Sequence, residues 1–134
     1  MKYHHKNSGF TTITLAILGA SALVLAAAGL AGLYAGRIKA RDAERVADVT
    51  AIGKALKTYY EYNQKYPPAV NGVPDGILSY LSFWPIAPKP DGSCSSDQNA
   101  YAYAQISGGE SYRLGFCLSA PTGRFPAGYN ELLP

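Results

Sequence analysis

The sequence is poor in the residues that most enzymes use for proton transfer and metal binding. Its only two histidines are His4 and His5, and its only two cysteines are Cys94 and Cys117. A chain processed beyond the first nine residues would contain no imidazole to act as a general base or a metal ligand. The sequence also has no Gly-rich phosphate loop, catalytic dyad or cofactor motif. We therefore predict that the protein is not an enzyme and has no organic cofactor.

Charged residues are absent from Asn7 to Gly36. At ~1.5 Å per residue, a helix of this length exceeds the ~30 Å hydrocarbon core of a bilayer, so the segment predicts a membrane-spanning helix. A cleavable secretory signal is the alternative. Its apolar core would cover only ~7–15 residues, and Ala26, Ala27 and Ala28 could mimic its small-residue cleavage site.

The net charge, the cysteines and the basic residues beside the apolar run bear on partners and on membrane orientation. A formal net charge of only +3 argues against a dedicated nucleic-acid-binding protein. An even pair of cysteines in a small domain is typical of a disulfide outside the cytoplasm, so we expect a Cys94–Cys117 bond. Counted alone, the basic residues beside the apolar run predict instead that the C-terminal part faces the cytoplasm, because more of them follow the run than precede it. Lys2 and Lys6 lie before it, and Arg37, Lys39, Arg41 and Arg45 lie after it.

Helical periodicity continues beyond the apolar run. Residues at helical spacing form one apolar stripe: Ile38, Val46, Val49, Ile52, Leu56, Tyr59 and Asn63. The charged residues between them are expected to form an ordinary solvated face: Asp42, Glu44, Arg45, Asp48, Lys54 and Lys57. Because Pro67 restricts Tyr66, this amphipathic helix should end near Asn63 to Lys65.

The C-terminal half predicts a long loop followed by a small antiparallel sheet. Residues 67–92 hold six of the nine prolines, which is typical of a connecting loop. Residues 100–106 and 111–118 are expected to form a hairpin, and a third, edge strand is expected around residues 123–129. A sheet this small needs an apolar surface to pack on, which the helical stripe supplies. The predicted fold is therefore α+β, with one long N-terminal helix packed on a small antiparallel sheet.

The second strand of the hairpin shows strict alternation, which predicts which side chains face the helix. The buried set should be Tyr112, Leu114, Phe116 and Leu118. The set facing solvent should be Ser111, Arg113, Gly115 and Cys117.

With these pieces in order, the chain resembles the type IV pilins and the type II secretion pseudopilins. In that family a short basic leader ends in glycine and is followed by phenylalanine and an apolar helix, as in Lys6-Asn7-Ser8-Gly9-Phe10-Thr11 here. Residues 40–67, ARDAERVADVTAIGKALKTYYEYNQKYP, are similar to the amphipathic helix of the major-pseudopilin-like branch. The motifs PKPDG, YAY and YRLGFCL at 88–92, 101–103 and 112–118 resemble that branch's sheet more weakly.

The resemblance implies a pilin-like fold in four parts. Residues 1–9 would be a leader that a prepilin peptidase removes after Gly9 on the cytoplasmic side, leaving Phe10 as an N-methylated N-terminus. Residues 10–36 would be the transmembrane or filament-core helix, 37–66 the amphipathic helix, and 67–134 the loop and sheet. The C-terminal domain would lie outside the cytoplasmic membrane, and the assembled filament would be periplasmic or on the cell surface.

The resemblance also implies partners and assembly residues. The partners would be copies of the chain, other pilins, the prepilin peptidase, an inner-membrane assembly platform and, before assembly, the lipid bilayer. Ala28, Gly32 and Gly36 recur every four residues and would let helix backbones approach closely. The alternative is the ordinary abundance of small residues in membrane helices.

Thr14 is the clearest departure from the family, which usually has glutamate at the fifth mature position. That glutamate is thought to pair with the N-terminal amine of a neighbouring subunit in the apolar core. Its absence removes a contact that would fix register. A minor subunit at the filament tip and a divergent major subunit are the two readings of this change.

A calcium site is a further implication of the resemblance, because pseudopilins of the secretion branch can hold calcium in the region of the oxygen-rich loop around Asp91 and Asp97. Calcium takes about six to eight oxygen ligands, and two separated carboxylates are a thin supply. A polar turn beside the disulfide is the simpler interpretation.

Two functions therefore follow from the sequence. The first is a structural subunit of a type IV pilus-like or type II secretion filament, with a minor or tip subunit as one form of it. The second is a monomeric, single-pass, membrane-anchored binding module whose helix never leaves the bilayer. They differ in processing, because the mature chain would begin at methylated Phe10 in the first case and at Met1 in the second.

Overall fold

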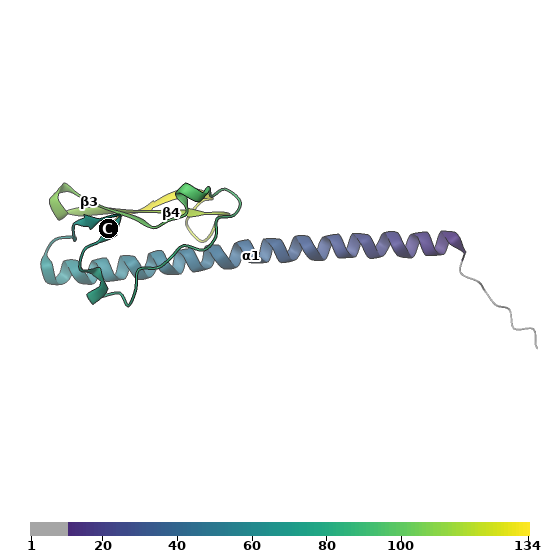
Figure 1. Ribbon diagram of the computed structural model, residues 1–134, viewed down its shortest axis with the longest axis horizontal. Coiled ribbons are helices and arrows are strands. Elements are labelled where there is room, and N and C mark those ends of the chain that lie inside the picture. Colours follow the sequence, from purple (N-terminus) through teal and green to yellow (C-terminus); the bar gives the residue numbers. More distant parts are fainter. Residues whose placement is uncertain (1–10) are drawn as a thin grey trace, which may run out of the picture. The chain divides into compact units, whose positions relative to one another are not determined.

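The protein has an α+β fold, with one long helix packed against small antiparallel sheets, in a computed structural model that describes residues 11–134 (Figure 1). The predicted leader and Phe10 lie outside the described residues. The helix α1 runs from Thr12 to Asn63. The chain divides into two compact units, one up to Gly36 and one from Arg37 to Pro134, and each is described by itself below.

The helix ends where the sequence predicts, at Asn63. Gln64 follows with a φ of 56°, and its N–H donates to the Tyr60 carbonyl at 2.8 Å. This is a left-handed helix cap, which satisfies one of the last free carbonyls of the helix. Pro67 follows three residues later and has no N–H with which to continue the ladder.

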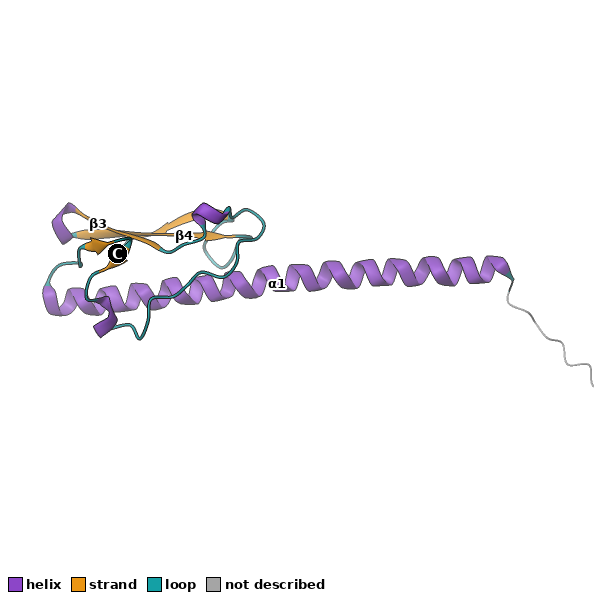
Figure 2. Ribbon diagram, in the orientation of Figure 1, coloured by secondary structure: helices purple, strands orange, loops and turns teal. Residues whose placement is uncertain are grey.

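The unit from Arg37 to Pro134 contains two sheets (Figure 2). The larger has the order β3-β4-β5, from strands β3 (Ala102–Ile106), β4 (Ser111–Leu118) and β5 (Gly128–Leu132), and both pairings are antiparallel. The predicted hairpin is therefore confirmed. The third strand starts at Gly128 and not at Gly123, which leaves Pro126 in the irregular segment before it, where its missing N–H costs no ladder bond.

A second hairpin lies inside the segment that the sequence analysis assigned to a connecting loop. Strands β1 (Ala69–Val70) and β2 (Val73–Pro74) pair through a turn at Asn71 and Gly72, whose φ angles are 51° and 78°. Asn-Gly with two positive φ angles is the preferred two-residue hairpin turn. The high proline content masked this signal. A short 3₁₀ helix, η1 (Ile77–Ser79), follows the hairpin.

The core of this unit lies between the sheet and one face of α1. Five of the predicted stripe and strand residues have no exposed surface at all: Ile52, Leu56, Leu114, Phe116 and Leu118. Ile38 and Asn63, at the two ends of the predicted stripe, lie outside the core. The predicted solvent face of β4 is wrong at two positions, because Gly115 and Cys117 are also buried.

Each of these two exceptions involves a partner from elsewhere in the chain. A Cβ added at Gly115 would lie 1.9 Å from the hydroxyl oxygen of Tyr129, so the tyrosine ring covers the glycine. Cys117 is bonded to Cys94, and both cysteines are buried. Alternation of residue types cannot reveal either kind of cover.

Candidate functional site

The N-terminal part of α1 exposes an uninterrupted apolar surface. From Thr12 to Gly36 every residue except Thr14 is exposed, including Ile13, Leu23 and Leu25 at 70%, 74% and 73%. Within the described residues this is the one helix that is long and apolar enough to cross a membrane. A surface of this kind requires lipid or apolar protein neighbours, because water does not favour a continuous patch of large aliphatic side chains.

The predicted assembly residues lie on this exposed segment. Apart from the adjoining backbone of α1, no atom of the chain lies within 4 Å of a Cβ placed at Gly32 or Gly36, so both positions are open to a neighbouring helix. Ala28 is exposed as well. The Thr14 hydroxyl is 2.8 Å from the Thr11 hydroxyl, so its polar group has a partner in the first helical turn. Gly9 and Phe10, the predicted processing residues, lie outside the described residues.

The C-terminal part of α1 carries a buried ion pair where the sequence analysis predicted a solvated face. Asp42 and Arg45 are 0% and 1% exposed, and their side chains meet at 2.7 Å. Lys54 and Lys57 are exposed, as predicted. The prediction failed at Asp42 and Arg45 because each has polar partners from distant parts of the chain, which helical periodicity cannot show.

Arg45 fixes the proline-rich loop to the helix. Its guanidinium donates to the carbonyls of Pro88 and Lys89 at 3.0 and 2.7 Å, to the Asn99 side-chain oxygen at 3.3 Å, and to the Ser119 hydroxyl at 3.2 Å. Only its Nε has no hydrogen-bond partner among the described residues. A planar guanidinium suits this role because it can donate to several oxygens at once.

Asp42 performs the matching task for the end of β4. Its two carboxylate oxygens accept hydrogen bonds from the backbone N–H groups of Ser119 and Ala120, both at 2.9 Å. One helical turn therefore holds the loop through Arg45 and the sheet through Asp42. We call Asp42, Arg45 and these partners the buried polar anchor.

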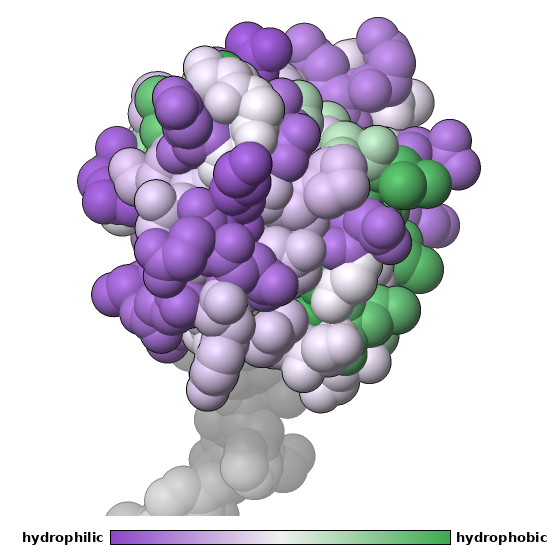
Figure 3. Space-filling model, turned by 90° about the vertical axis from the view of Figure 1, so that its left-hand side faces the viewer, coloured by the Kyte–Doolittle hydropathy of each residue, from purple (hydrophilic) through white to green (hydrophobic). Residues whose placement is uncertain are grey.

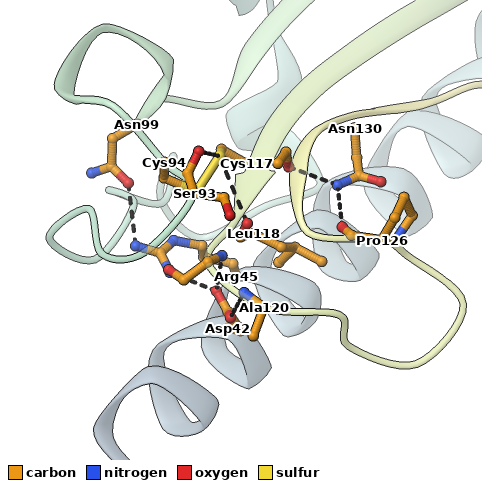
Figure 4. The surroundings of a disulfide bond; sticks show 12 residues. Asp42, Arg45, Ser93, Cys94, Asn99, Cys117, Leu118, Ala120, Pro126 and Asn130 are labelled. Atoms are coloured by element: carbon orange, nitrogen blue, oxygen red, sulfur yellow. Dashed lines mark hydrogen bonds and ion pairs between the residues drawn. A yellow bond between two sulfur atoms is a disulfide. The ribbon is translucent and has the colours of Figure 1, made fainter. Parts of the chain in front are cut away.

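The predicted disulfide lies directly beside the buried polar anchor (Figure 4). Cys94 and Cys117 are joined, with their Cα atoms 5.8 Å apart and 23 positions apart in sequence. By the loop-entropy model, closing a loop of this length contributes about 3 kcal/mol. The bond and the anchor thus fix the same loop to β4 and α1 respectively.

Two further polar contacts link the loop side of the domain to α1. The Arg41 guanidinium forms an ion pair with the Asp91 carboxylate. The Tyr101 hydroxyl donates to Asp48 at 2.7 Å, and burial together with this hydrogen bond raises the pKa of Tyr101 well above its usual range. Asp48 therefore also departs from the predicted solvated face.

The calcium candidates Asp91 and Asp97 occupy different surroundings. Arg41 already neutralises Asp91, whereas Asp97 lies exposed in the short 3₁₀ helix η2 (Ser96–Gln98). Across residues 11–134 no group of three or more histidine, cysteine, aspartate and glutamate side chains is placed to hold a metal ion. The calcium site stays a prediction from the sequence.

A groove opens between α1 and the C-terminal end of the chain. Its volume is about 590 Å³, within the ~300–1,000 Å³ of ordinary ligand sites. Aromatic side chains form much of its lining, namely Tyr60, Tyr66, Tyr112 and Phe125. Lys54, Lys57, Arg124 and Glu61 are the charged residues of its wall. We call this feature the aromatic groove.

Comparisons with protein-family models, curated proteins and solved structures found no match to this chain. The functional argument therefore stands on the chain's own residues. The buried polar anchor and the aromatic groove are the features that the sequence analysis missed. A signal for the anchor was present in Asp42 and Arg45, because their spacing of three places them on the same side of the helix as Val49 and Ile52.

Proposed function

We propose that the protein is a structural subunit of an extracytoplasmic filament of the type IV pilus or type II secretion kind. Residues 12–36 anchor each copy in the membrane before assembly, and these helices then pack against one another in the filament core. The observation that carries the proposal is the combination of a charge-free, exposed apolar segment with a domain that has its own core on the same helix.

The exposed helix supports exchange between lipid and protein surroundings. It has no charged side chain that would have to be neutralised in either environment. The open positions at Gly32 and Gly36 would allow close helix contact without loss of any contact that the chain makes with itself. Assembly would then replace lipid neighbours with apolar protein neighbours.

The buried polar anchor supports the same proposal from the other end of α1. Asp42 and Arg45 fasten the loop and the sheet to a single turn of the helix, and the disulfide closes the loop beside them. A domain held in this way stays attached to residues 42–45 when the helix is drawn from the membrane. The disulfide also suits an oxidising compartment, where such bonds persist.

Processing is the decisive experiment. The protein is isolated from membranes and from sheared extracellular material, and its N-terminal peptide is identified by mass spectrometry. We expect a chain that begins at N-methylated Phe10 in both fractions. Gly9→Val should leave the leader attached and abolish the extracellular form, whereas the matched variant Ser8→Ala should be processed normally.

Two results would contradict the proposal. A mature chain that begins beyond Ala28 would mean that the apolar helix is a discarded signal. A chain that begins at Met1 in the membrane and never reaches the extracellular fraction would instead support a monomeric, membrane-anchored binding module, for which the aromatic groove offers a site.

A further inference from the structure

The domain exposes large hydrophobic side chains in one loop as well as the aromatic groove. Between Asp75 and Ile86 the chain exposes Leu78, Phe83 and Ile86 at 62%, 68% and 90%. We call residues 75–86 the apolar loop. Figure 3 shows apolar surface concentrated on one side of this end of the molecule. Single exposed hydrophobic residues are common, whereas several gathered on one side of a surface favour a contact with a partner.

The apolar loop and the aromatic groove lie on opposite flanks of α1. The groove uses Lys54 and Lys57, whereas the loop is packed on the helix through Tyr80, whose ring lies 5.7 Å from that of Tyr59 and 6.0 Å from that of Tyr62. At 3.6 residues per turn, Lys57 and Tyr59 point about 160° apart around the helix. A single copy therefore cannot place its own loop in its own groove.

The charges of the two surfaces are complementary. The groove wall has three basic residues, Lys54, Lys57 and Arg124, against the single acid Glu61. None of the three forms an ion pair within residues 11–134. The apolar loop contains Asp75, which is exposed, and no basic residue. Opposite charge at the rim of an apolar contact favours the correct partner and disfavours like surfaces.

From this arrangement we propose that the apolar loop of one copy docks in the aromatic groove of the next copy. The contact joins two different surfaces, so each copy keeps a free groove and a free loop after pairing. Such heterologous contacts propagate into rings or open helical filaments. The inference rests on the proposed filament function, because assembly is what brings successive domains together.

Cross-linking of the full chain in its native membranes and filaments tests the contact. Lys57→Cys and Phe83→Cys are combined in one chain, and a short bismaleimide joins free thiols without opening the buried disulfide. We expect a ladder of multimers from the double variant and none from either single variant. The matched pair Glu110→Cys and Phe83→Cys, which places one thiol at the exposed hairpin turn, should give no ladder.

Charge exchange gives a second measurement in the Lys57→Cys, Phe83→Cys chain. Arg124→Glu or Asp75→Lys alone should reduce the ladder by about tenfold, since like charges would then meet at the rim. The two changes together should restore it. Restoration by the pair would not be expected if each change simply damaged the fold.

Helix-to-helix cross-linking through Gly32→Cys separates this proposal from the filament proposal. A Gly32→Cys product without a Lys57–Phe83 ladder overturns the docking contact and leaves the filament standing. A ladder in membranes from chains that lack methylated Phe10 supports the docking contact and overturns the filament. Attachment of Lys57→Cys to a different protein assigns the groove to that partner and overturns the proposal.

Discussion

The two compact units use the same helix α1 in opposite ways. From Thr12 to Gly36 the helix exposes its apolar side chains and has no charge, whereas from Arg37 onward it buries Val49, Ile52 and Leu56 and even a charged pair. The exposed side chains of the first segment are open to contacts with a second molecule, lipid or protein. The second has its contacts supplied by its own loop and sheet, so a mutation in either segment should affect a different measurement.

The largest effect is expected from Arg45→Met in the buried polar anchor. The substitution would leave the Asp42 carboxylate buried without its counter-charge, and removing one member of a buried pair costs about 3–5 kcal/mol. Urea unfolding of the full chain in detergent, followed by Trp84 fluorescence, measures the loss. Lys54→Met, at an exposed position of the same helix, should change the free energy of unfolding by less than about 0.5 kcal/mol.

The double variant Asp42→Leu, Arg45→Met distinguishes pairing from packing. Removing both charges should restore part of the stability, because no unpaired charge remains, although the N–H groups of Ser119 and Ala120 lose their acceptor. A double variant that is no more stable than Arg45→Met would mean that the hydrogen bonds to the loop and β4 matter more than the charge balance.

A charge introduced into the exposed segment should impair membrane insertion and leave the stability of the domain unchanged. Leu23→Arg places a guanidinium where the side chain is 74% exposed on the apolar helix, at a cost to membrane insertion of about 2.5–3.5 kcal/mol. Carbonate extraction of membranes should release more of this variant than of Leu23→Ala. The urea midpoint of the domain should be unchanged, and a shift in that midpoint would contradict the separation of the two units.

The sequence predicts the parts of the fold that depend on local pattern. The end of α1 at Asn63, the hairpin of β3 and β4, and the Cys94–Cys117 bond follow from proline position, alternation and cysteine count. The β1–β2 turn at Asn71 and Gly72 was equally local and was overlooked among the prolines. These features need only neighbouring residues to specify them.

Features that depend on distant partners could not be predicted in this way. Arg45 is buried because carbonyls 43 and 44 positions later reach it, and no local pattern encodes that contact. Gly115 is buried because the Tyr129 ring lies over it. The aromatic groove likewise requires residues from α1 and the end of the chain to come together.

Alkaline pH should lower the free energy of unfolding of the domain from Arg37 to Pro134, which contains the packed tyrosines. Burial, and the nearby Tyr66, raise the pKa of Tyr112 from 10.0 to about 12. The folded protein binds the Tyr112 hydroxyl proton more tightly than the unfolded chain does. The stability that this proton contributes is therefore complete below pH 10 and is lost as the pH rises toward 12. Urea midpoints measured across this interval should fall, and Tyr112→Phe should reduce the slope. A midpoint independent of pH in the unmodified chain would contradict this account of Tyr112.

The smallest effect on the isolated chain is expected from Gly32→Leu, where assembly and not folding is at stake. Nothing lies within 4 Å of the added Cβ, and leucine favours a helix over glycine by up to about 0.8 kcal/mol, so the single subunit should insert and fold normally. A filament that packs through Ala28, Gly32 and Gly36 would lose close helix contact, and the sheared extracellular fraction should disappear. Gly19→Leu is the matched control, because Gly19 is equally open but lies about 140° away around the helix. Equal filament yields from the two leucine variants would mean that the small-residue face is not the packing surface.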